Sequence, residues 1–290
     1  MKRVIIPLLT GCLLLGGVSG FATGAEQVTV TDDRGTAIVI SSPPDRIIAV
    51  GALYAQVLVD LGAVDRLVAI ADSPNNPSEV ADLVSVGPSY APNVEVIISL
   101  SPDLVLGATD WGGERPALEA AGFIVLTTPM LTSIPEILAS VRTIGTAVGL
   151  AADAIALTGR ISEAVAEVEN RVLGLPRTRA AFLYPPSLGV APYAAGADAI
   201  EGDLLTRAGA SNVFADVSGF PQVNLEDVLA RDPEVIFTDP SQIAFITDDP
   251  LLQGVSAVKS GRVFGINAGR ATSTAVADVL AKMARLLHPE

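Results

Sequence analysis

The residues best suited to covalent chemistry lie near the C-terminal end of the chain. Ser256-Ala-Val-Lys259 matches the S-x-x-K pattern of penicillin-recognising enzymes, and the overlapping Lys259-Ser260-Gly261 resembles their K-T-G motif. In those enzymes the two motifs lie far apart, whereas here one lysine would serve both, and no S-D-N occurs. An exported hydrolase that uses Ser256 and Lys259 is therefore kept only as an alternative to the binding function for which the rest of the sequence argues.

Other catalytic and metal-binding patterns are missing from the sequence. The single histidine is His288, two positions from the end, where we expect a solvent-exposed tail. Without a histidine in the body of the chain, most hydrolytic triads and the usual zinc sites cannot be built. No G-x-S-x-G, Walker loop, G-x-G-x-x-G or H-E-x-x-H occurs. We therefore expect binding without turnover, with no catalytic residue, metal site or cofactor.

Two carboxylates occupy equivalent places in an internal repeat. Asn93-Val-Glu95 and Asn224-Leu-Glu226 each precede a short apolar stretch, a proline and a buried strand. An asparagine can cap a helix N-terminus, and a glutamate in the first turn suits the helix dipole. The simplest interpretation is that the asparagine and glutamate of each copy only stabilise a helix start. The pairing instead favours a two-pronged acidic surface that a dimeric receptor with basic pockets could bind.

Strands alternate with helices on both sides of the repeat. A β-hairpin is expected around Asp32-Asp33-Arg34-Gly35, followed by a buried strand at 46–51, a helix at 54–62 and a strand at 67–71. The same alternation resumes at residue 180. This order predicts an α/β protein with two Rossmann-like lobes, each built on a parallel sheet.

One long helix is expected to join the lobes. Apolar residues recur at helical spacing from Leu150 to Gly174. About 23 helical residues would reach roughly 35 Å, the width of a lobe. The predicted organisation is a signal peptide at 1–25, an N-terminal lobe at 26–149, a rigid helix at 150–174 and a C-terminal lobe at 175–290.

The N-terminus predicts export. Lys2 and Arg3 precede an apolar stretch that ends in small residues up to Ala25, as in a secretory signal peptide. Cys12, in Leu-Thr-Gly-Cys, also matches the site at which bacterial lipoproteins are acylated, so a lipid anchor is the alternative to cleavage after Ala25. The excess of 32 acidic over 18 basic residues opposes binding to nucleic acid or anionic lipid. We expect a periplasmic protein.

The chain resembles the periplasmic binding proteins of ABC importers for iron-siderophore, haem and cobalamin, whose lobes are bridged by one long helix. The resemblance covers essentially the whole mature chain. The motifs that carry it include Asp32-Asp33-Arg34-Gly35, Pro44-Asp45-Arg46-Ile47-Ile48, Leu61-Gly62-Ala63-Val64-Asp65-Arg66, Ala208-Gly209-Ala210-Ser211-Asn212 and Phe220-Pro221-Gln222-Val223-Asn224-Leu225-Glu226.

The resemblance implies partners and gives the repeat a role. In the family, glutamates matching Glu95 and Glu226 pair with arginines of the membrane permease. We therefore expect a monomer that delivers a small metal chelate to a permease and its ATPase.

Ligands of open α/β sheets bind beyond the carboxyl ends of the strands, here between the lobes. The loops at those ends supply the candidate ligand-binding residues Tyr54, Tyr90, Trp111, Tyr193, Phe220 and Arg270. Flat rings suit a macrocycle or a catecholate chelate.

The resemblance places Tyr193 and Phe220 where cobalamin binders often carry aromatics, and Arg270 near a polar ligand contact. Haem binders usually carry a tyrosine where this chain has Pro88, and anionic siderophores usually meet several arginines. The chelate class stays open among siderophore, cobalamin and haem.

Overall fold

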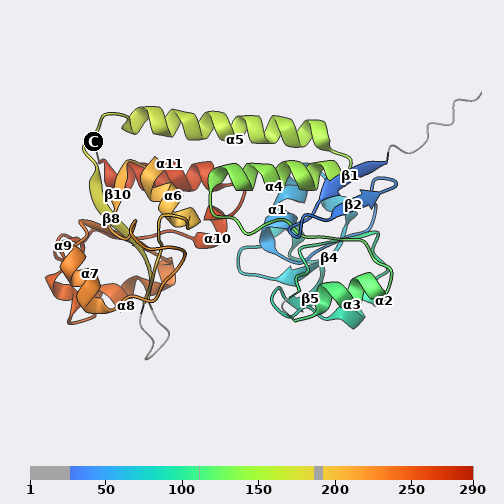
Figure 1. Ribbon diagram of the computed structural model, residues 1–290, viewed down its shortest axis with the longest axis horizontal. Coiled ribbons are helices and arrows are strands. Elements are labelled where there is room, and N and C mark those ends of the chain that lie inside the picture. Colours follow the sequence, from blue (N-terminus) through green and yellow to red (C-terminus); the bar gives the residue numbers. More distant parts are fainter. Residues whose placement is uncertain (1–26, 111, 186–191, 290) are drawn as a thin grey trace, which may run out of the picture.

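The computed structural model describes residues 27–110, 112–185 and 192–289. The predicted signal peptide, Cys12 and Trp111 lie outside these ranges. Two lobes lie side by side below one long helix, α5 (Ala151–Val172) (Figure 1). This arrangement confirms the predicted fold class.

The N-terminal lobe begins with an antiparallel hairpin, β1 (Val28–Thr31) and β2 (Ala37–Ile40). Its parallel sheet has the order β5-β4-β3-β6-β7. The strands are β3 (Ile47–Ala49), β4 (Leu67–Asp72), β5 (Val84–Pro88), β6 (Leu104–Leu106) and β7 (Val125–Leu126). The helices are α1 (Ala52–Asp60), α2 (Val94–Ser99), α3 (Glu114–Ala120) and α4 (Ile134–Ala147). Buried side chains on every residue of β3 and β6 fit the covered faces of a parallel sheet.

The C-terminal lobe repeats this plan. Its parallel sheet has the order β10-β8-β11-β12, and β9 pairs antiparallel with the end of β8. The strands are β8 (Thr178–Tyr184), β9 (Tyr193–Ala194), β10 (Ala210–Asn212), β11 (Val235–Thr238) and β12 (Val263–Gly265). The helices are α6 (Ile200–Arg207), α7 (Leu225–Arg231), α8 (Ile243–Thr247), α9 (Ser256–Lys259), α10 (Ala268–Ala271) and α11 (Val276–Leu287).

Helix α5 packs on α4 of one lobe and on α11 of the other (Figure 1). Its buried side chains recur every three or four residues and form one stripe. They are Ala154, Leu157, Thr158, Ile161, Val165 and Val168. Ile155 is also apolar, but it lies off this stripe and is 63% exposed.

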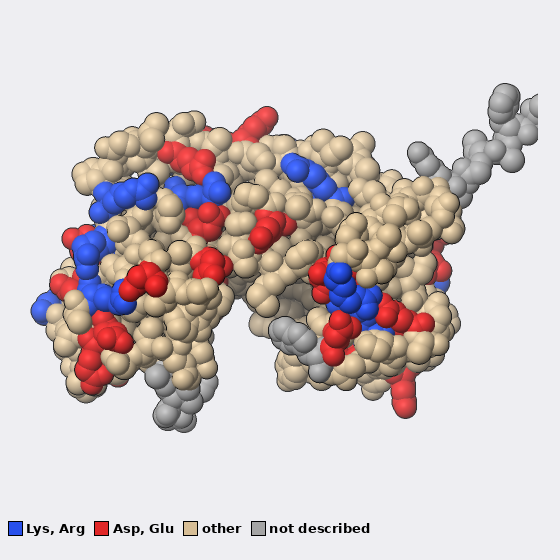
Figure 2. Space-filling model, in the orientation of Figure 1, with Lys and Arg blue, Asp and Glu red and all other residues tan. Residues whose placement is uncertain are grey.

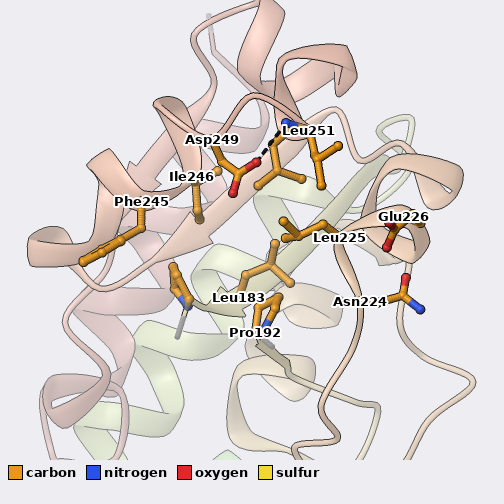
Figure 3. Close-up of a pocket in the computed structure, with 11 residues that line it drawn as sticks. Leu183, Pro192, Asn224, Leu225, Glu226, Phe245, Ile246, Asp249 and Leu251 are labelled. Atoms are coloured by element: carbon orange, nitrogen blue, oxygen red, sulfur yellow. Dashed lines mark hydrogen bonds between the residues drawn. The ribbon is translucent and has the colours of Figure 1, made fainter. Parts of the chain in front are cut away.

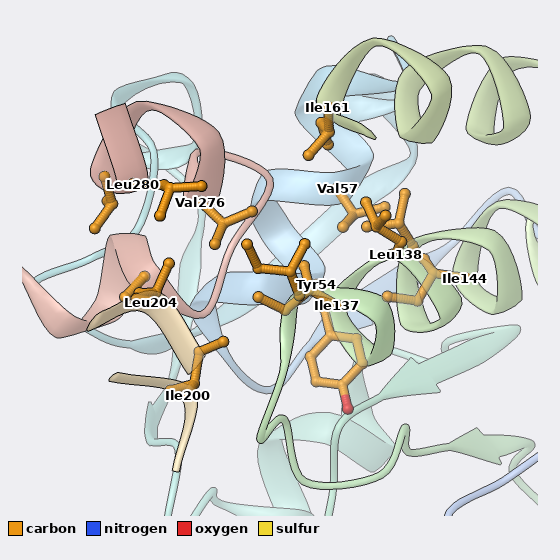
Figure 4. Packing of buried hydrophobic residues seen from close by; sticks show 14 of the residues in the cluster. Tyr54, Val57, Ile137, Leu138, Ile144, Ile161, Ile200, Leu204, Val276 and Leu280 are labelled. Carbon is orange, nitrogen blue, oxygen red and sulfur yellow. The ribbon is translucent and has the colours of Figure 1, made fainter. Parts of the chain in front are cut away.

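The lobes share one hydrophobic core. A single cluster of buried residues takes side chains from α1 and α4, from α5, and from α6 and α11 (Figure 4). Two smaller clusters belong to one lobe each, one around Ile97 and one around Ile246. Hydrogen bonds also cross between the lobes, since the Ile134 N–H donates to Asp203 Oδ2 at 3.0 Å and the Thr274 hydroxyl donates to Asp60. The upper parts of both lobes therefore form one packed body.

In the part of the chain that the structure describes, no helix combines the length and the apolar character needed to cross a bilayer.

Candidate functional site

A notch separates the lobes on the side away from α5 (Figure 2). The loops that follow the carboxyl ends of the parallel strands are the expected ligand-contacting segments of such a fold.

Tyr54 supports a loop rather than offering a free hydroxyl. Its side chain is in the shared core with 8% exposure, and its hydroxyl lies 3.1 Å from Thr128 Oγ1 while also accepting the Thr128 N–H. The ring packs against Gly107, where an added Cβ would meet it at 2.3 Å. Burial raises the pKa of Tyr54. Tyr54 thus holds the segment after β7 against the segment after β6.

Two other side chains of the N-terminal lobe are exposed in loops that follow strands. Tyr90, after β5, is 77% exposed. Met130, after β7, is 72% exposed and was not among the predicted residues. Composition gave no signal for Met130, because nothing in the sequence shows which apolar residue of a loop stays uncovered.

The C-terminal lobe carries an aromatic cluster, defined as Tyr184, Tyr193 and Phe220. The rings of Tyr184 and Phe220 meet edge to face, with centroids 5.8 Å apart. Tyr193 pairs with Tyr184 across β9 and β8, and its hydroxyl accepts a hydrogen bond from Gln222 at 3.0 Å. Tyr193 and Phe220 remain 39% and 44% exposed, so they can contact a ligand. Tyr184 was not predicted, and its position at the end of a buried strand was the available signal.

Arg270 lies between the lobes, in α10. It lines a polar cavity of about 330 Å³ together with Gln56 and Asn75 of the N-terminal lobe and Ser273 of its own lobe. Gly269 contacts Asn75 so closely that an added Cβ would lie 2.0 Å from the amide. The Arg270 guanidinium is 3.7 Å from Asp278 in an exposed ion pair, so it can reorient toward a ligand at little cost.

The two copies of the Asn-x-Glu repeat form the expected helix caps. Asn93 Oδ1 accepts the Val96 N–H at 3.1 Å, and Asn224 Oδ1 accepts the Asp227 N–H at 2.6 Å. Glu95 and Glu226 sit exposed in the first turns of α2 and α7. The two helices belong to different lobes and lie below α5 (Figure 1). Acidic side chains appear at the lower end of both lobes (Figure 2).

Beside Glu226 an apolar cavity of about 250 Å³ opens between α7 and α8 (Figure 3). Its walls include Leu183, Leu225 and the exposed Phe245, with Glu226 and Asp249 among the lining residues. Leu183 and Tyr184 are consecutive in β8 and point to opposite faces of the sheet. The apolar cavity and the aromatic cluster therefore lie on different sides of β8.

The structure does not support the hydrolase alternative. The Ser256 hydroxyl donates to Asp232 Oδ2 at 2.9 Å, and the Ser256 N–H donates to Asp232 Oδ1 at 2.7 Å. These bonds lower the pKa of Asp232 and tie the end of α7 to the start of α9. Ser256 is thus engaged in fastening two helices, which is a structural role.

His288 is half-buried rather than an exposed tail, because its ring packs near Gly209 and its Nε2 is buried without a partner. Among the described residues, no three histidine, cysteine or carboxylate side chains gather in a group that could hold a metal ion.

Comparisons with known proteins agree with this geometry. Residues 47–268 match the family model described as periplasmic binding protein. A cobalamin-binding protein of Halobacterium salinarum is 28% identical, with 90% of this chain and 74% of the relative covered. A vitamin B12-binding protein of Vibrio cholerae is 26% identical, covering 78% of this chain and 82% of the relative.

Solved structures show the same fold. An ABC-type Fe3+-hydroxamate transport protein of Saccharomonospora viridis superposes with a TM-score of 0.77 at 29% identity, covering 90% of this chain and 99% of that one. The periplasmic vitamin B12 binding protein of Vibrio cholerae superposes with a TM-score of 0.71 at 22% identity, covering 84% and 97%. This chain belongs to the periplasmic binding protein family, and it is a substrate-binding protein rather than an enzyme.

Proposed function

We propose that this protein captures a corrinoid of the cobalamin type between its lobes, outside the cytoplasm, and delivers it to an ABC importer. The observation that carries the proposal is the exposed aromatic surface of Tyr90, Tyr193 and Phe220, which lie in strand β9 and in loops of both lobes. A corrin ring is broad and largely apolar on its faces, so aromatic side chains can cover it with little cost in conformational entropy.

The distribution of charge supports a ligand of low net charge. The residues that line the polar cavity between the lobes include one basic side chain, Arg270, and one acidic side chain, Glu79. An anionic ferric chelate would require several basic groups to offset its desolvation. The amide-rich periphery of a corrinoid instead suits neutral polar groups such as Asn75 and Gln56. The relatives named as cobalamin-binding add weight to this choice.

Delivery is proposed to use Glu95 and Glu226. They are exposed, they sit on separate lobes, and each stands on a helix start fixed by an asparagine cap. Basic side chains on a permease would pair with them. Exposed ion pairs contribute about 0–1 kcal/mol each, so the pair serves mainly orientation and selectivity. The export signal and the alternative anchor at Cys12 remain part of the proposal, because they fall on residues outside the described ranges.

Calorimetric titration of the mature chain with cyanocobalamin, haemin, a ferric hydroxamate and a ferric catecholate tests the ligand. We expect saturable binding of cyanocobalamin at one site. Ligand at 100 times its Kd should stabilise the fold by about 2.7 kcal/mol. Binding of haemin or a ferric chelate without binding of cyanocobalamin would contradict the corrinoid assignment.

A further inference from the structure

A buried carboxyl group lies behind the aromatic cluster. Glu201, in the first turn of α6, is 2% exposed. The Tyr184 hydroxyl donates to Glu201 Oε1 at 2.5 Å. The other oxygen, Oε2, is buried without a hydrogen-bond partner. Burying a carboxyl group with half of its acceptors unused costs several kcal/mol in an isolated case, so its presence calls for a reason.

Packing of the core does not supply that reason. An apolar residue at position 201 would fill the same volume next to Ile200, which lies in the shared core (Figure 4). The carboxyl makes one contact that an apolar side chain cannot make, namely the bond to Tyr184. A second carboxylate, Asp239, raises the pKa of Tyr184 through its charge. Asp239 Oδ1 accepts hydrogen bonds from the N–H and the hydroxyl of Ser241.

The ring of Tyr184 contacts the exposed ring of Phe220. Its ring lies between Phe182, 5.1 Å away by centroids, and Phe220, 5.8 Å away in an edge-to-face contact. Phe182 is fully buried, whereas Phe220 is 44% exposed. The three rings therefore run from the core to the surface. Anchoring the hydroxyl of the middle ring restricts the rotation of that ring and limits where the outer ring can rest.

Helix α6 gives Glu201 a rigid base. Gly202 packs on the Gly196 carbonyl so tightly that an added Cβ would lie 2.0 Å from the oxygen. Asp203 is bonded to the Ile134 N–H of the other lobe. The two residues that follow Glu201 in α6 are thus fixed, so its carboxyl stands on a packed helix rather than on a loop.

We infer that Glu201 is a positioning residue for the ligand: through Tyr184 it holds the Phe220 ring in the orientation that receives a flat macrocycle. The inference rests on the proposed corrinoid-binding function and deepens it. Preorganisation of this kind reduces the entropy lost when the ligand binds. A hydrogen bond of ordinary strength makes the expected effect on affinity about threefold to tenfold.

The test compares Glu201→Ala, Glu201→Gln and Tyr184→Phe in the full mature chain, with Glu163→Gln on the exposed face of α5 as the matched control. Calorimetry with cyanocobalamin should show about threefold to tenfold weaker binding for E201A and Y184F. E201Q should bind within about threefold of wild type, because its amide oxygen can accept the tyrosine hydroxyl. Equal affinity in wild type, E201A and Y184F would overturn the inference, as would a loss in E201Q as large as that in E201A.

Crystal structures of wild type and Y184F provide a readout that needs no ligand. We expect one Phe220 rotamer in wild type, and a second rotamer or a displaced ring in Y184F. An unmoved Phe220 ring in Y184F overturns the inference. If wild type binds none of the chelates, the proposed function fails, and this structural comparison still decides whether Glu201 positions the ring.

Discussion

The upper and lower parts of this molecule are built differently. Under α5, side chains from both lobes pack into one core, whereas further down each lobe has a core of its own, around Ile97 in one and Ile246 in the other. The helices α2 and α7, which carry Glu95 and Glu226, belong to these separate parts. The lobes are thus packed together under α5, where a hinge would otherwise lie. They are independent at their lower ends, where a partner would contact them.

Truncation in the shared core should have the largest effect. Leu204→Ala, at a fully buried site, should lower the free energy of unfolding by about 2–5 kcal/mol. Hydrogen exchange should accelerate in both lobes. Ile97→Ala and Ile246→Ala serve as controls, and each should accelerate exchange mainly in its own lobe. If L204A affected the C-terminal lobe alone, the shared core would not be a single cooperative unit.

Charge reversal at Glu95 and Glu226 should have the next largest effect. We expect Glu95→Arg combined with Glu226→Arg to lower importer-dependent uptake of labelled cyanocobalamin by at least about tenfold, because like charges would face the permease. Each single charge reversal should lower uptake by a smaller factor than the double reversal. Binding of cyanocobalamin to the isolated protein should not change. Glu163→Arg on α5 is the matched control, and undiminished uptake by the double variant would refute the docking role.

The helix caps should show a smaller and strictly local effect. Asn93→Ala and Asn224→Ala each remove a side-chain acceptor from a helix start and should cost about 1 kcal/mol. Faster amide exchange should be confined to the first turn of α2 or α7. Asn→Asp at either site should restore protection, since aspartate also caps helices. Exchange that rose equally in the shared core would show that the lower parts are not independent.

The smallest expected effect is a pH dependence at Glu201. Burial raises the pKa of Glu201 above its usual value of 4.5, so the folded protein holds this proton more tightly than the unfolded chain. Stability from this group is complete below pH 4.5 and falls as pH rises through the folded pKa. The Tm of Glu201→Gln, relative to that of wild type, should therefore increase as the pH rises from 4.5 through the folded pKa of Glu201. A constant difference in Tm across that range would show that Glu201 titrates normally.

Local patterns in the sequence predicted more than long-range ones. The Asn-x-Glu repeat and the long helix depend on capping and periodicity within one segment, so both appear where expected, α5 within two residues of each predicted end. Tyr54 was placed in a cleft loop, yet helix α1 turns its side chain into the core. The bond between Tyr184 and Glu201 depends on how α6 packs on β8, which no spacing in the chain specifies.

The position of α5 has a mechanical consequence. Its 22 residues at about 1.5 Å each make a strut of about 33 Å along the back of both lobes. Pulling α2 and α7 apart would bend α5 and strain the packed layer beneath it. Such deformation requires work, so thermal motion alone should seldom open the notch. An importer that binds both lobes can supply that work. Ligand release would then be a step driven by the transporter.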